Sequence, residues 1–306
     1  MSGNYAIRNF RNEDFTEYLK LLALNERLQP SGRCITADEV VAELKRPGYS
    51  PEQALFVAEF GDQLVGYLDV ELERLIGRAI LTCWLAPQYR RFGLAEGLIE
   101  QATIRARELE ASIVQMRVSD ARQSWKKLVI RLGFEFVRSF PKLSVGLAGR
   151  SQNVDSDGTG FSDLSLVGLE GLVNIQNRAF AGAWGYCPNT LAEISYRFSA
   201  NHNSPQDIII ASEESKVVGY CWTKPSCGSG RLEGIGRIFM LGVDPEYQGR
   251  CLGRKLLMAG LAYLENQGLK AAWLEVDGEN KDALRLYRSL GFRRYASTSW
   301  YQKSVG

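Results

Sequence analysis

The chain contains two copies of one sequence pattern, and this duplication constrains its fold more than any other feature. The segment APQYRRFGLAEGLIEQA at 86–102 matches DPEYQGRCLGRKLLMAG at 244–260. Further along, RLGFEFVRS at 131–139 matches SLGFRRYAS at 289–297, at the same offset of 158 residues. Two separate blocks that share one offset indicate a duplicated structural unit.

The position of the boundary between the copies follows from length and composition. The 306 residues suit two domains of about 150 residues each. The segment GRSQNVDSDGTG is rich in Gly, Ser and Asp and has no hydrophobic periodicity, which is typical of a linker. We therefore expect an N-terminal domain at 1–148, a linker at 149–160 and a C-terminal domain at 161–306.

Hydrophobic periodicity predicts the same order of interleaved strands and helices in both copies. The first copy should open with a strand at 5–10 and a helix at 14–24, with Asp14 as its N-cap. Further strands are expected at 55–59, 64–70, 79–85 and 113–118, and in the second copy at 208–212, 217–223, 237–243 and 271–276. This order favours an α/β (α+β) fold of two tandem domains, each a mixed, mostly antiparallel sheet flanked by helices.

Composition excludes several classes of function. The net charge of +2 gives no sign of a nucleic-acid partner, and no apolar run is long enough for a membrane span. The start of the sequence is polar and does not resemble a signal peptide. Six cysteines without a CxxC pair indicate reduced thiols and a cytoplasmic location. With His202 as the only histidine, we expect no metal site.

Each copy has a turn between its central strand and the following helix that suits a phosphate group. In the second copy the strand ends before a proline, and small residues then open the helix. The amides of a first helical turn have no partner within the helix and carry the positive end of its dipole. Small residues allow a diphosphate to approach these amides, and Arg250, Arg254 and Lys255 add positive charge.

These turns resemble the acetyl-CoA signature of the GNAT acetyltransferase superfamily, which has the form [Q/R]-x-x-G-x-[G/A]. The first copy reads RRFGLA at 90–95, and the second reads QGRCLG at 248–253, with Cys251 where the family usually has glycine. A tandem pair of this length is most similar to mycothiol synthase and its relatives. The resemblance implies acetyl-CoA as donor and predicts these cofactor-binding residues: Leu241, Gly242, Val243, Gln248, Gly249, Arg250, Cys251, Leu252, Gly253, Arg254, Asn280 and Tyr287 in the second copy, and Arg90, Arg91, Gly93 and Ala95 in the first.

The second copy also has the residues that would carry the chemistry. Its segment at 280–292 resembles the family element N-x-x-A-x-x-x-Y-x-x-x-G-F, in which Asn280 is the expected N-cap and Gly291 the expected end of the helix. The resemblance implies that Tyr287 protonates the leaving thiolate of CoA. The first copy has Arg122, Trp125 and Val129 at the positions of Asn280, Ala283 and Tyr287, so we expect it to be non-catalytic.

The general base and the acceptor site are predicted less sharply by the sequence. In mycothiol synthase a glutamate begins the central strand, where this chain has Arg237. Glu233 is our candidate for the catalytic base, and Glu275 on the neighbouring strand is the alternative. Arg237 suits an acceptor with a carboxylate or phosphate. Trp184 and Tyr186, which lie beside glycines, are the other candidates for acceptor contacts.

We therefore expect an N-acetyltransferase that moves an acetyl group from acetyl-CoA to the amine of a small molecule by direct attack. The C-terminal copy should be active, without a metal, in a monomer or homodimer. Two alternatives remain open at this point. One is a catalytically inactive regulatory protein that binds acyl-CoA, and the other is a protein N-acetyltransferase.

Overall fold

The computed structural model describes residues 5–30, 35–61, 63–90, 93–150, 160–200, 203–225 and 234–306. The chain forms two compact units, one of Met1–Phe140 with Ala296–Gly306 and one of Pro141–Tyr295. These units differ from the predicted division at two segments, since 141–148 belongs to the second unit and Ala296–Gly306 to the first. Of the predicted linker, 151–159 lies outside the described residues.

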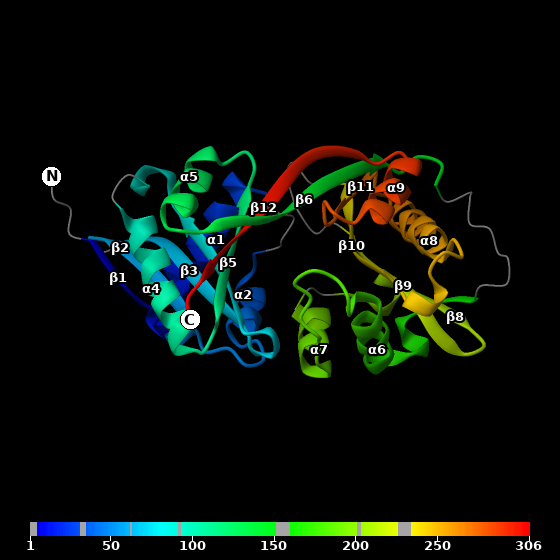
Figure 1. The fold of residues 1–306 in the computed structure, drawn as a ribbon, viewed down its shortest axis with the longest axis horizontal. Helices are drawn as coiled ribbons and strands as arrows, with labels where there is room; N and C mark the ends of the chain where they lie inside the picture. Colours follow the sequence, from blue (N-terminus) through cyan, green and yellow to red (C-terminus); the bar gives the residue numbers. More distant parts are fainter. Residues whose placement is uncertain are drawn as a thin grey trace. The chain divides into compact units, whose positions relative to one another are not determined.

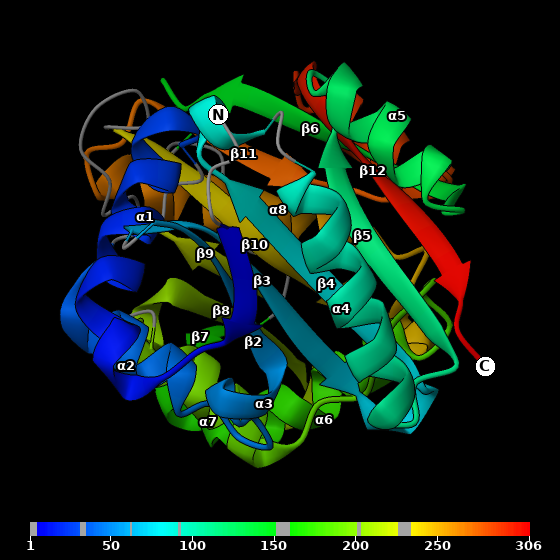
Figure 2. The same ribbon diagram turned by 90° about the vertical axis from the view of Figure 1, so that its left-hand side faces the viewer.

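The first unit is a mixed sheet with helices on both faces (Figure 2). Strand β4 pairs in parallel with β5, and the other pairs within this unit are antiparallel. Its elements are β1 (Tyr5–Asn9), α1 (Phe15–Leu28), α2 (Ala37–Leu44), α3 (Pro51–Ala54), β2 (Leu55–Phe60), β3 (Gln63–Glu73), β4 (Arg78–Leu85), α4 (Leu94–Glu108), β5 (Ile113–Ser119), α5 (Gln123–Arg131) and the start of β6 (Glu135–Gly146).

The second unit repeats this plan, with β10 parallel to β11 and the other pairs within the unit antiparallel. In Figure 1, helices α8 and α9 lie on one side of its strands, and α6 and α7 lie on the other. Its elements are β7 (Gly160–Asp163), α6 (Gly168–Phe180), α7 (Leu191–Ala200), β8 (Ile208–Glu213), β9 (Lys216–Lys224), β10 (Ile235–Val243), α8 (Leu252–Asn266), β11 (Ala271–Glu275), α9 (Lys281–Ser289) and the start of β12 (Arg293–Ser304).

The last strand of each copy completes the sheet of the other unit. Strand β12 pairs with β5 of the first unit, where Thr298 lies opposite Ser119. Strand β6 pairs with β11 of the second unit, where Leu143 lies opposite Leu274. Because of this exchange, the units are not continuous in sequence. The two final strands are equivalent, and their own residues do not specify which sheet they join.

Each sheet is covered by apolar residues on both faces, which follows from strands that alternate their side chains. In the second unit one cluster lies under α8 and α9 and includes Leu143, Ile238 and Leu274. The other lies under α6 and α7 and includes Ile208, Tyr220 and Trp222. The first unit has two corresponding clusters, one with α4 and one with α1.

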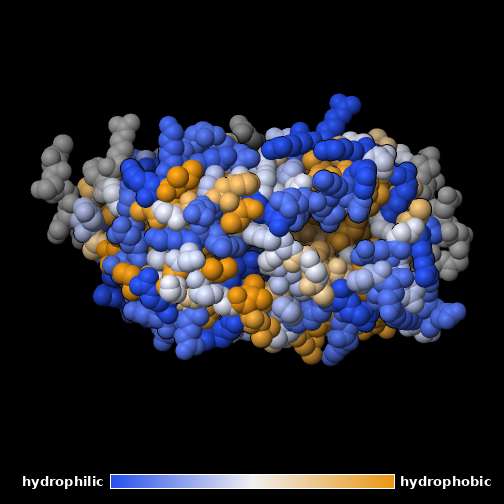
Figure 3. Space-filling view, viewed as in Figure 1, coloured by the Kyte–Doolittle hydropathy of each residue, from blue (hydrophilic) through white to orange (hydrophobic). Residues whose placement is uncertain are grey.

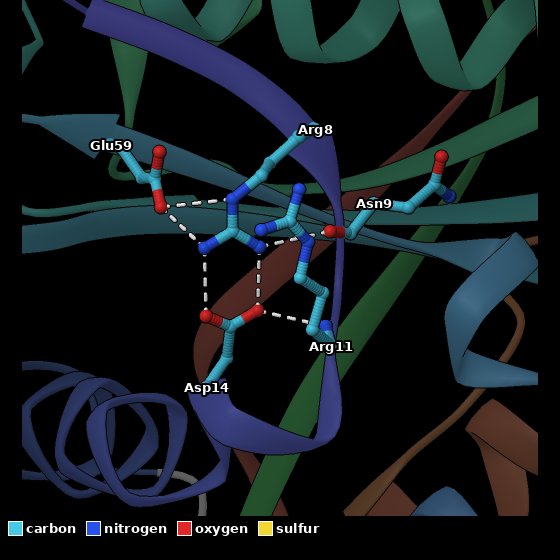
Figure 4. Close-up of polar contacts among 5 residues, drawn as sticks. All are labelled: Arg8, Asn9, Arg11, Asp14 and Glu59. Atoms are coloured by element: carbon cyan, nitrogen blue, oxygen red, sulfur yellow. Dashed lines mark hydrogen bonds and ion pairs between the residues drawn. The ribbon is translucent and has the colours of Figure 1, made fainter.

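The predicted strands and helices agree with the structure to within a few residues, and Asp14 stands at the N-cap position of α1 as predicted, but its carboxylate does not cap the helix. Asp14 precedes α1 without accepting a hydrogen bond from its first turn. A short 3₁₀ turn directs its carboxylate back to β1, where it accepts bonds from Arg8 at 2.6 and 2.7 Å and from the Arg11 amide at 2.8 Å. Figure 4 shows Arg8 between Asp14 and Glu59, so this guanidinium joins β1, β2 and the start of α1.

The surface face in Figure 3 is largely hydrophilic, with apolar side chains scattered between polar ones. Among the described residues, every helix is too short or too polar to cross a lipid bilayer. Of the cysteines that the structure describes, Cys83, Cys221 and Cys251 are free thiols, and Cys187 is half-buried. His202 lies outside the described residues.

Candidate active site

The central strand β10 of the second unit has a β-bulge at Phe239. Ile238 lies opposite Thr223 and Met240 opposite Trp222, so Phe239 is an extra residue in the ladder with β9. The equivalent ladder in the first unit runs in continuous register, from Gly66 opposite Leu85 to Glu73 opposite Arg78. Bulges redirect backbone groups and side chains and are frequent beside active sites. The sequence analysis did not predict this bulge, because no glycine or other local signal marks it.

Beyond the bulge, β10 and β11 separate. Their parallel pairing ends with Arg237 opposite Trp273, whereas β10 continues to Val243. The Asp244 amide donates to Val218 at 2.9 Å, which sets the alternation of hydrogen bonds with β9. By that alternation, the amides of Leu241 and Val243 face away from β9. They therefore point to the side on which β11 has diverged. There they are placed to donate hydrogen bonds to the oxygen of an acetyl carbonyl.

The turn after β10 presents a run of backbone amides. Gly249 has φ +77° and Cys251 has φ +60°, both left-handed. The amides of Arg254 and Lys255 bond to the Cys251 carbonyl at 3.0 and 3.2 Å. In this fully described turn, the amides of 249–253 form no backbone hydrogen bond. Together with the positive end of the α8 dipole, they form a site suited to a diphosphate.

Side chains around the turn hold it against the strand and add charge. The side-chain amide of Gln248 donates to the Val243 carbonyl at 3.2 Å and links the turn to the end of β10. Arg254 donates to the Ser289 hydroxyl at 3.0 Å, which links α8 to α9. Arg250 lies 3.9 Å from a Glu213 oxygen and is exposed, so its guanidinium is available to an anion at the turn.

Gly253 brings the strand end, the turn and α9 together. A Cβ atom at this position would lie 3.7 Å from Val243 Cγ2 and 3.8 Å from Leu286 Cδ2. Both are ordinary van der Waals distances, so an alanine fits here but a larger side chain does not. The predicted cofactor residues of β10, the turn and α9 are thus neighbours.

The start of α9 is fixed as predicted. The Asn280 side chain accepts a hydrogen bond from the Ala283 amide at 3.0 Å, and Gly291 ends the helix region with φ +86°. Tyr287 follows on the buried face and has 7% of its surface exposed. Its ring lies 5.7 Å from that of Phe292, within the apolar cluster under α8 and α9. Burial, with a smaller contribution from Cys221, raises the pKa of its hydroxyl above the ordinary value, so the hydroxyl is protonated at neutral pH.

In the first unit, apolar side chains occupy the equivalent positions. Trp125 and Val129 are buried where the second unit has Ala283 and Tyr287. Trp84, also buried, stands where the second unit has Gly242. A Cβ at Gly242 would lie 2.6 Å from the Tyr220 ring, so the second unit requires glycine there. The first unit therefore lacks both the tyrosine hydroxyl and the small strand residue.

The first-unit turn is described only in part. Arg90 donates to the Leu85 carbonyl at 3.1 Å, and Gly93 begins α4 with φ +72°. Arg90, Ala95 and Trp125 are among the residues that line a cavity of about 310 Å³. Arg91 lies outside the described residues.

The candidates for acceptor contacts fall on the face of the sheet opposite α8. Arg237 stacks on Trp273, with 4.5 Å from its guanidinium carbon to the ring centre. Glu275 lies two residues further along β11 and is partly buried. Both influence Tyr295, whose pKa is raised to about 12 by burial first and then by Glu275, while Arg237 lowers it. Glu233 lies outside the described residues.

Tyr186 is held in place by a local network of hydrogen bonds. Its hydroxyl donates to Asn177 Oδ1 at 2.7 Å and accepts from Asn189 Nδ2 at 2.8 Å. Its ring stacks on Phe180 at 5.6 Å. These contacts fix the loop between α6 and α7, in which Tyr186 and the neighbouring Trp184 are both half-buried.

The arrangement has no cluster of metal ligands among the described residues. What it offers is a pair of strand amides beside an opening, a row of amides at a helix start and a protonated phenol nearby. This combination suits the binding of a phosphate-bearing acyl thioester and the stabilisation of charge on its carbonyl oxygen.

The chain is similar to known proteins in both its sequence and its fold. The model of the Acetyltransferase (GNAT) family matches residues 8–134 and again 169–292. A mycothiol acetyltransferase of Stackebrandtia nassauensis is 28% identical over 304 residues, which cover 94% of this chain and 95% of that protein. A mycothiol acetyltransferase of Thermomonospora curvata is 38% identical over 135 residues, and this match spans only 42% of each chain.

Two solved structures share the fold over almost the whole chain. A tandem GNAT protein from the clavulanic acid biosynthesis pathway has a TM-score of 0.76 and 16% identity, with 99% of both chains covered. A GCN5-related N-acetyltransferase from Sphaerobacter thermophilus has a TM-score of 0.74 and 19% identity, with 98% of this chain and 96% of that chain covered. At these identities the likeness concerns the fold alone.

Proposed function

The chain belongs to the GNAT acetyltransferase family, whose members use an acyl-CoA donor, and we propose that its second copy acetylates the amine of a small molecule from acetyl-CoA. The observation that carries the proposal is the separation of β10 and β11. The separation leaves an opening beside the amides of Leu241 and Val243. This opening lies one short turn away from the amides of 249–253, which form no backbone hydrogen bond. One extended cofactor can reach both groups.

The proposed reaction is a direct transfer. The neutral amine of the acceptor attacks the thioester carbonyl carbon, and the tetrahedral oxyanion accepts hydrogen bonds from the Leu241 and Val243 amides. The intermediate collapses with loss of the CoA thiolate, and the amide product forms as the amine loses a proton. No residue of the protein is acylated in this sequence of steps.

Tyr287 is the proposed donor of the proton that the thiolate takes up. A thiol in water has a pKa of about 8.5, well below that of a buried phenol. The same apolar surroundings that raise the pKa of Tyr287 also raise the pKa of a thiolate bound beside it, which narrows the difference. Transfer from the phenol to the sulfur therefore becomes less unfavourable where both groups are shielded from water.

The amine needs a group that accepts its proton. We propose Glu275 for this role. It lies on β11, two residues beyond the end of the pairing between β11 and β10, and on the same sheet face as Arg237. A carboxylate there can accept the proton directly or through a water molecule. Glu233, the other proposed base, precedes β10 and stays a prediction.

The names of the relatives support a small-molecule acceptor. The relative from Stackebrandtia nassauensis, which matches this chain over nearly its full length, is called a mycothiol acetyltransferase. We propose the same class of reaction for this chain without assigning the same acceptor.

The proposal is tested in two stages with the full chain. Acetyl-CoA at a hundred times its Kd should stabilise the protein by about 2.7 kcal/mol, which is measured as a rise in Tm. A panel of amines, with release of the free CoA thiol as readout, then identifies acceptors. Binding without release for any amine would favour the inactive acyl-CoA-binding protein, and release only with proteins or peptides would favour a protein acetyltransferase.

A further inference from the structure

Two buried polar side chains of the second unit meet at the sulfur of Met240 on β10. Gln176 on α6 and Tyr220 on β9 both have 0% of their surface exposed. The Gln176 Nε2 donates to Met240 Sδ at 2.8 Å, and the Tyr220 hydroxyl donates to the same sulfur at 3.8 Å. The sequence analysis predicted no role for these three residues.

The sulfur is a poor partner for both groups. A thioether is a weak acceptor and cannot donate, which also fixes the orientation of the Gln176 amide. The other end of that amide, Oε1, is buried and has no hydrogen-bond partner in the described part of the chain. Buried polar groups are nearly always paired, because an unpaired one destabilises the fold. Gln176 and Tyr220 therefore have more hydrogen-bonding capacity than the protein itself uses.

The β-bulge of β10 places Met240 on this side of the sheet. Ile238 belongs to the apolar cluster under α8 and α9, and in a regular strand Met240, two residues later, would share its face. Because Phe239 is an extra residue, Met240 packs instead with the cluster under α6 and α7, which lie on the other side in Figure 1. The bulge thus brings Met240 to Gln176 and Tyr220, an effect that is frequent beside active sites.

The three side chains lie beside the amides of the proposed reaction. Met240 directly precedes Leu241, whose amide is proposed to bind the carbonyl oxygen of the thioester. Gly242 follows, and a Cβ there would lie 2.6 Å from the Tyr220 ring and 2.9 Å from Ala179 of α6. Helix α6 and strand β9 are therefore packed directly against β10 at the residues on either side of Leu241.

Met240 can act as a movable cover over the two polar groups. Its side chain is half-buried, whereas Gln176 and Tyr220 are fully buried. Methionine is unbranched and has three rotatable bonds, so it changes its conformation at little cost. A rotation of Met240 gives up two weak contacts to sulfur and uncovers a stronger donor and acceptor pair.

The chemistry of the pair selects what binds there. Gln176 Oε1 only accepts, so the bound group must donate to it, and the Tyr220 hydroxyl and Gln176 Nε2 need an acceptor. Burial raises the pKa of Tyr220 well above its ordinary value, so this hydroxyl stays protonated at neutral pH. A hydroxyl group donates and accepts at once. A carboxylate cannot donate and an ammonium group cannot accept.

We propose that Gln176 and Tyr220 bind an uncharged hydroxyl group of the amine acceptor, and that Met240 moves aside to admit it. This inference rests on the proposed acetyl transfer and adds the chemical class of the acceptor and the residues that select it. Since Met240 and Leu241 are neighbours, about 3.3 Å apart along the strand, a short carbon chain connects the hydroxyl to the amine.

The test compares amines that differ in one terminal group. The probes are 3-aminopropan-1-ol against butylamine, 4-aminobutan-1-ol against pentylamine, and 3-aminopropanoate as the anionic compound. Turnover is followed by release of the CoA thiol, and binding by calorimetry in the presence of CoA, which needs no turnover. We expect kcat/KM to favour the hydroxyl member of a pair by about tenfold or more, because a methyl group leaves the buried polar groups unpaired. The anionic compound should be poor.

The variants connect this preference to the two polar groups. Gln176→Leu and Tyr220→Phe remove the polar atoms and nearly keep the size of each side chain. Each should remove most of the hydroxyl preference and leave the Kd of acetyl-CoA unchanged. Met240→Ala removes the cover and should keep the preference, since both polar groups remain.

A stability measurement distinguishes binding from a structural role. Gln176→Leu should raise the Tm, because it replaces an unpaired buried amide with an apolar group. The matched control is Gln115→Leu. Gln115 is 2% exposed, but its amide accepts from Arg78 at 3.2 Å and donates to Gln302 at 2.8 Å. This variant should lower the Tm and keep the hydroxyl preference. If Gln176→Leu does not fold, Tyr220→Phe decides the question.

The outcomes separate this inference from the proposed function. Equal kcat/KM within each pair, or a hydroxyl preference that survives both Gln176→Leu and Tyr220→Phe, would overturn the hydroxyl site and leave acetyl transfer intact. Loss of the preference in Met240→Ala would overturn the role of Met240 as a cover. Stronger binding of the hydroxyl member that is lost in Gln176→Leu, without release of CoA thiol from any amine, would support the site and overturn the proposed transfer.

Discussion

Gly93 and Cys251 occupy equivalent positions in the two copies and share one backbone conformation, with φ +72° and +60° at the residue before α4 and α8. Left-handed φ is free of steric cost for glycine but costs other residues about 1–2 kcal/mol. The second copy therefore keeps the shape of the turn at the expense of strain at Cys251.

Replacement of Cys251 by glycine should relieve this strain. Because glycine also has more freedom in the unfolded chain, the net gain should be at most about 1 kcal/mol in the free energy of unfolding. Chemical denaturation measures it. Gly93→Ala is the reciprocal change and should destabilise the protein. A loss of stability in Cys251→Gly would contradict the strain argument.

The thiol of Cys251 should report on cofactor binding. It is exposed at the turn, whereas burial raises the pKa of Cys83 and Cys221 to about 12 and makes both unreactive at neutral pH. A thiol reagent should therefore modify Cys251 well before those two, and acetyl-CoA should slow the reaction. Mass spectrometry of the labelled peptides gives the order, and unchanged labelling with saturating acetyl-CoA would count against a cofactor at this turn.

Removal of the Tyr287 hydroxyl tests its role as proton donor. Tyr287→Phe should lower kcat by about ten- to a thousandfold, the range of general-acid effects, with little change in the Kd of acetyl-CoA. The ring and its packing against Phe292 remain. Tyr263→Phe, which removes a hydroxyl on α8 that is bonded to Asp207 at 2.8 Å, is the control for a lost hydroxyl elsewhere in the second unit. Full turnover in Tyr287→Phe would end the proton-donor assignment.

Two substitutions at Gly253 should show whether this position accepts a methyl group but not a larger side chain. A Cβ at this position meets Val243 and Leu286 at ordinary contact distances, and the first copy has Ala95 here. Gly253→Ala should therefore preserve both the Tm and the Kd of acetyl-CoA. Gly253→Val adds methyl groups that displace α9 or block the diphosphate, and it should weaken binding by tenfold or more (about 1.4 kcal/mol). Equal affinity in the two variants would show that the cofactor does not approach α8 here.

The ion pair of Arg8 and Asp14 should appear in the acid stability of the protein. The Arg8 guanidinium lowers the pKa of Asp14 below its ordinary value of 3.8. A lowered pKa gives stability that is present above 3.8 and is lost as the pH falls through the folded-state pKa. Asp14→Asn should remove about 1–2 kcal/mol at pH 7 and less at pH 3.

The control for this prediction is Glu17→Gln, which breaks the exposed Glu17–Lys20 pair. An exposed pair contributes little to stability, so this variant should follow the wild type at every pH. Denaturant curves between pH 3 and pH 7 measure both variants. An equal effect of Asp14→Asn at pH 3 and pH 7 would show that the loss comes from packing rather than from charge.

Local signals in the sequence were sufficient for much of the candidate site. The repeat located two strand–turn–helix units, and the structure has β10 and α8 on either side of the predicted turn. Asn280 caps α9 as expected, because a cap depends only on its own residue and the next three. Asp14 shows the limit of this reasoning, since its carboxylate bonds to a strand residue rather than to the helix that it precedes.

Other features depend on residues that are far apart in the chain. The bulge at Phe239 exists only in the pairing of β10 with β9, and neither strand signals it alone. Lys142 lies opposite Glu275 only because β6 leaves its own copy and pairs with β11. Trp273 stacks with Arg237 through strand register that sequence periodicity cannot supply.

The sequence by itself thus determined the duplicated fold, the turn between the central strand and the helix, and the difference between Tyr287 and Val129, because residue identity and short-range spacing carry them. Only the tertiary structure decided which strand completes which sheet, where β10 opens and which charges meet beside that opening. The physical reason is that backbone hydrogen bonds between strands are alike in every residue, so the choice of partner and register is made by packing over the whole unit.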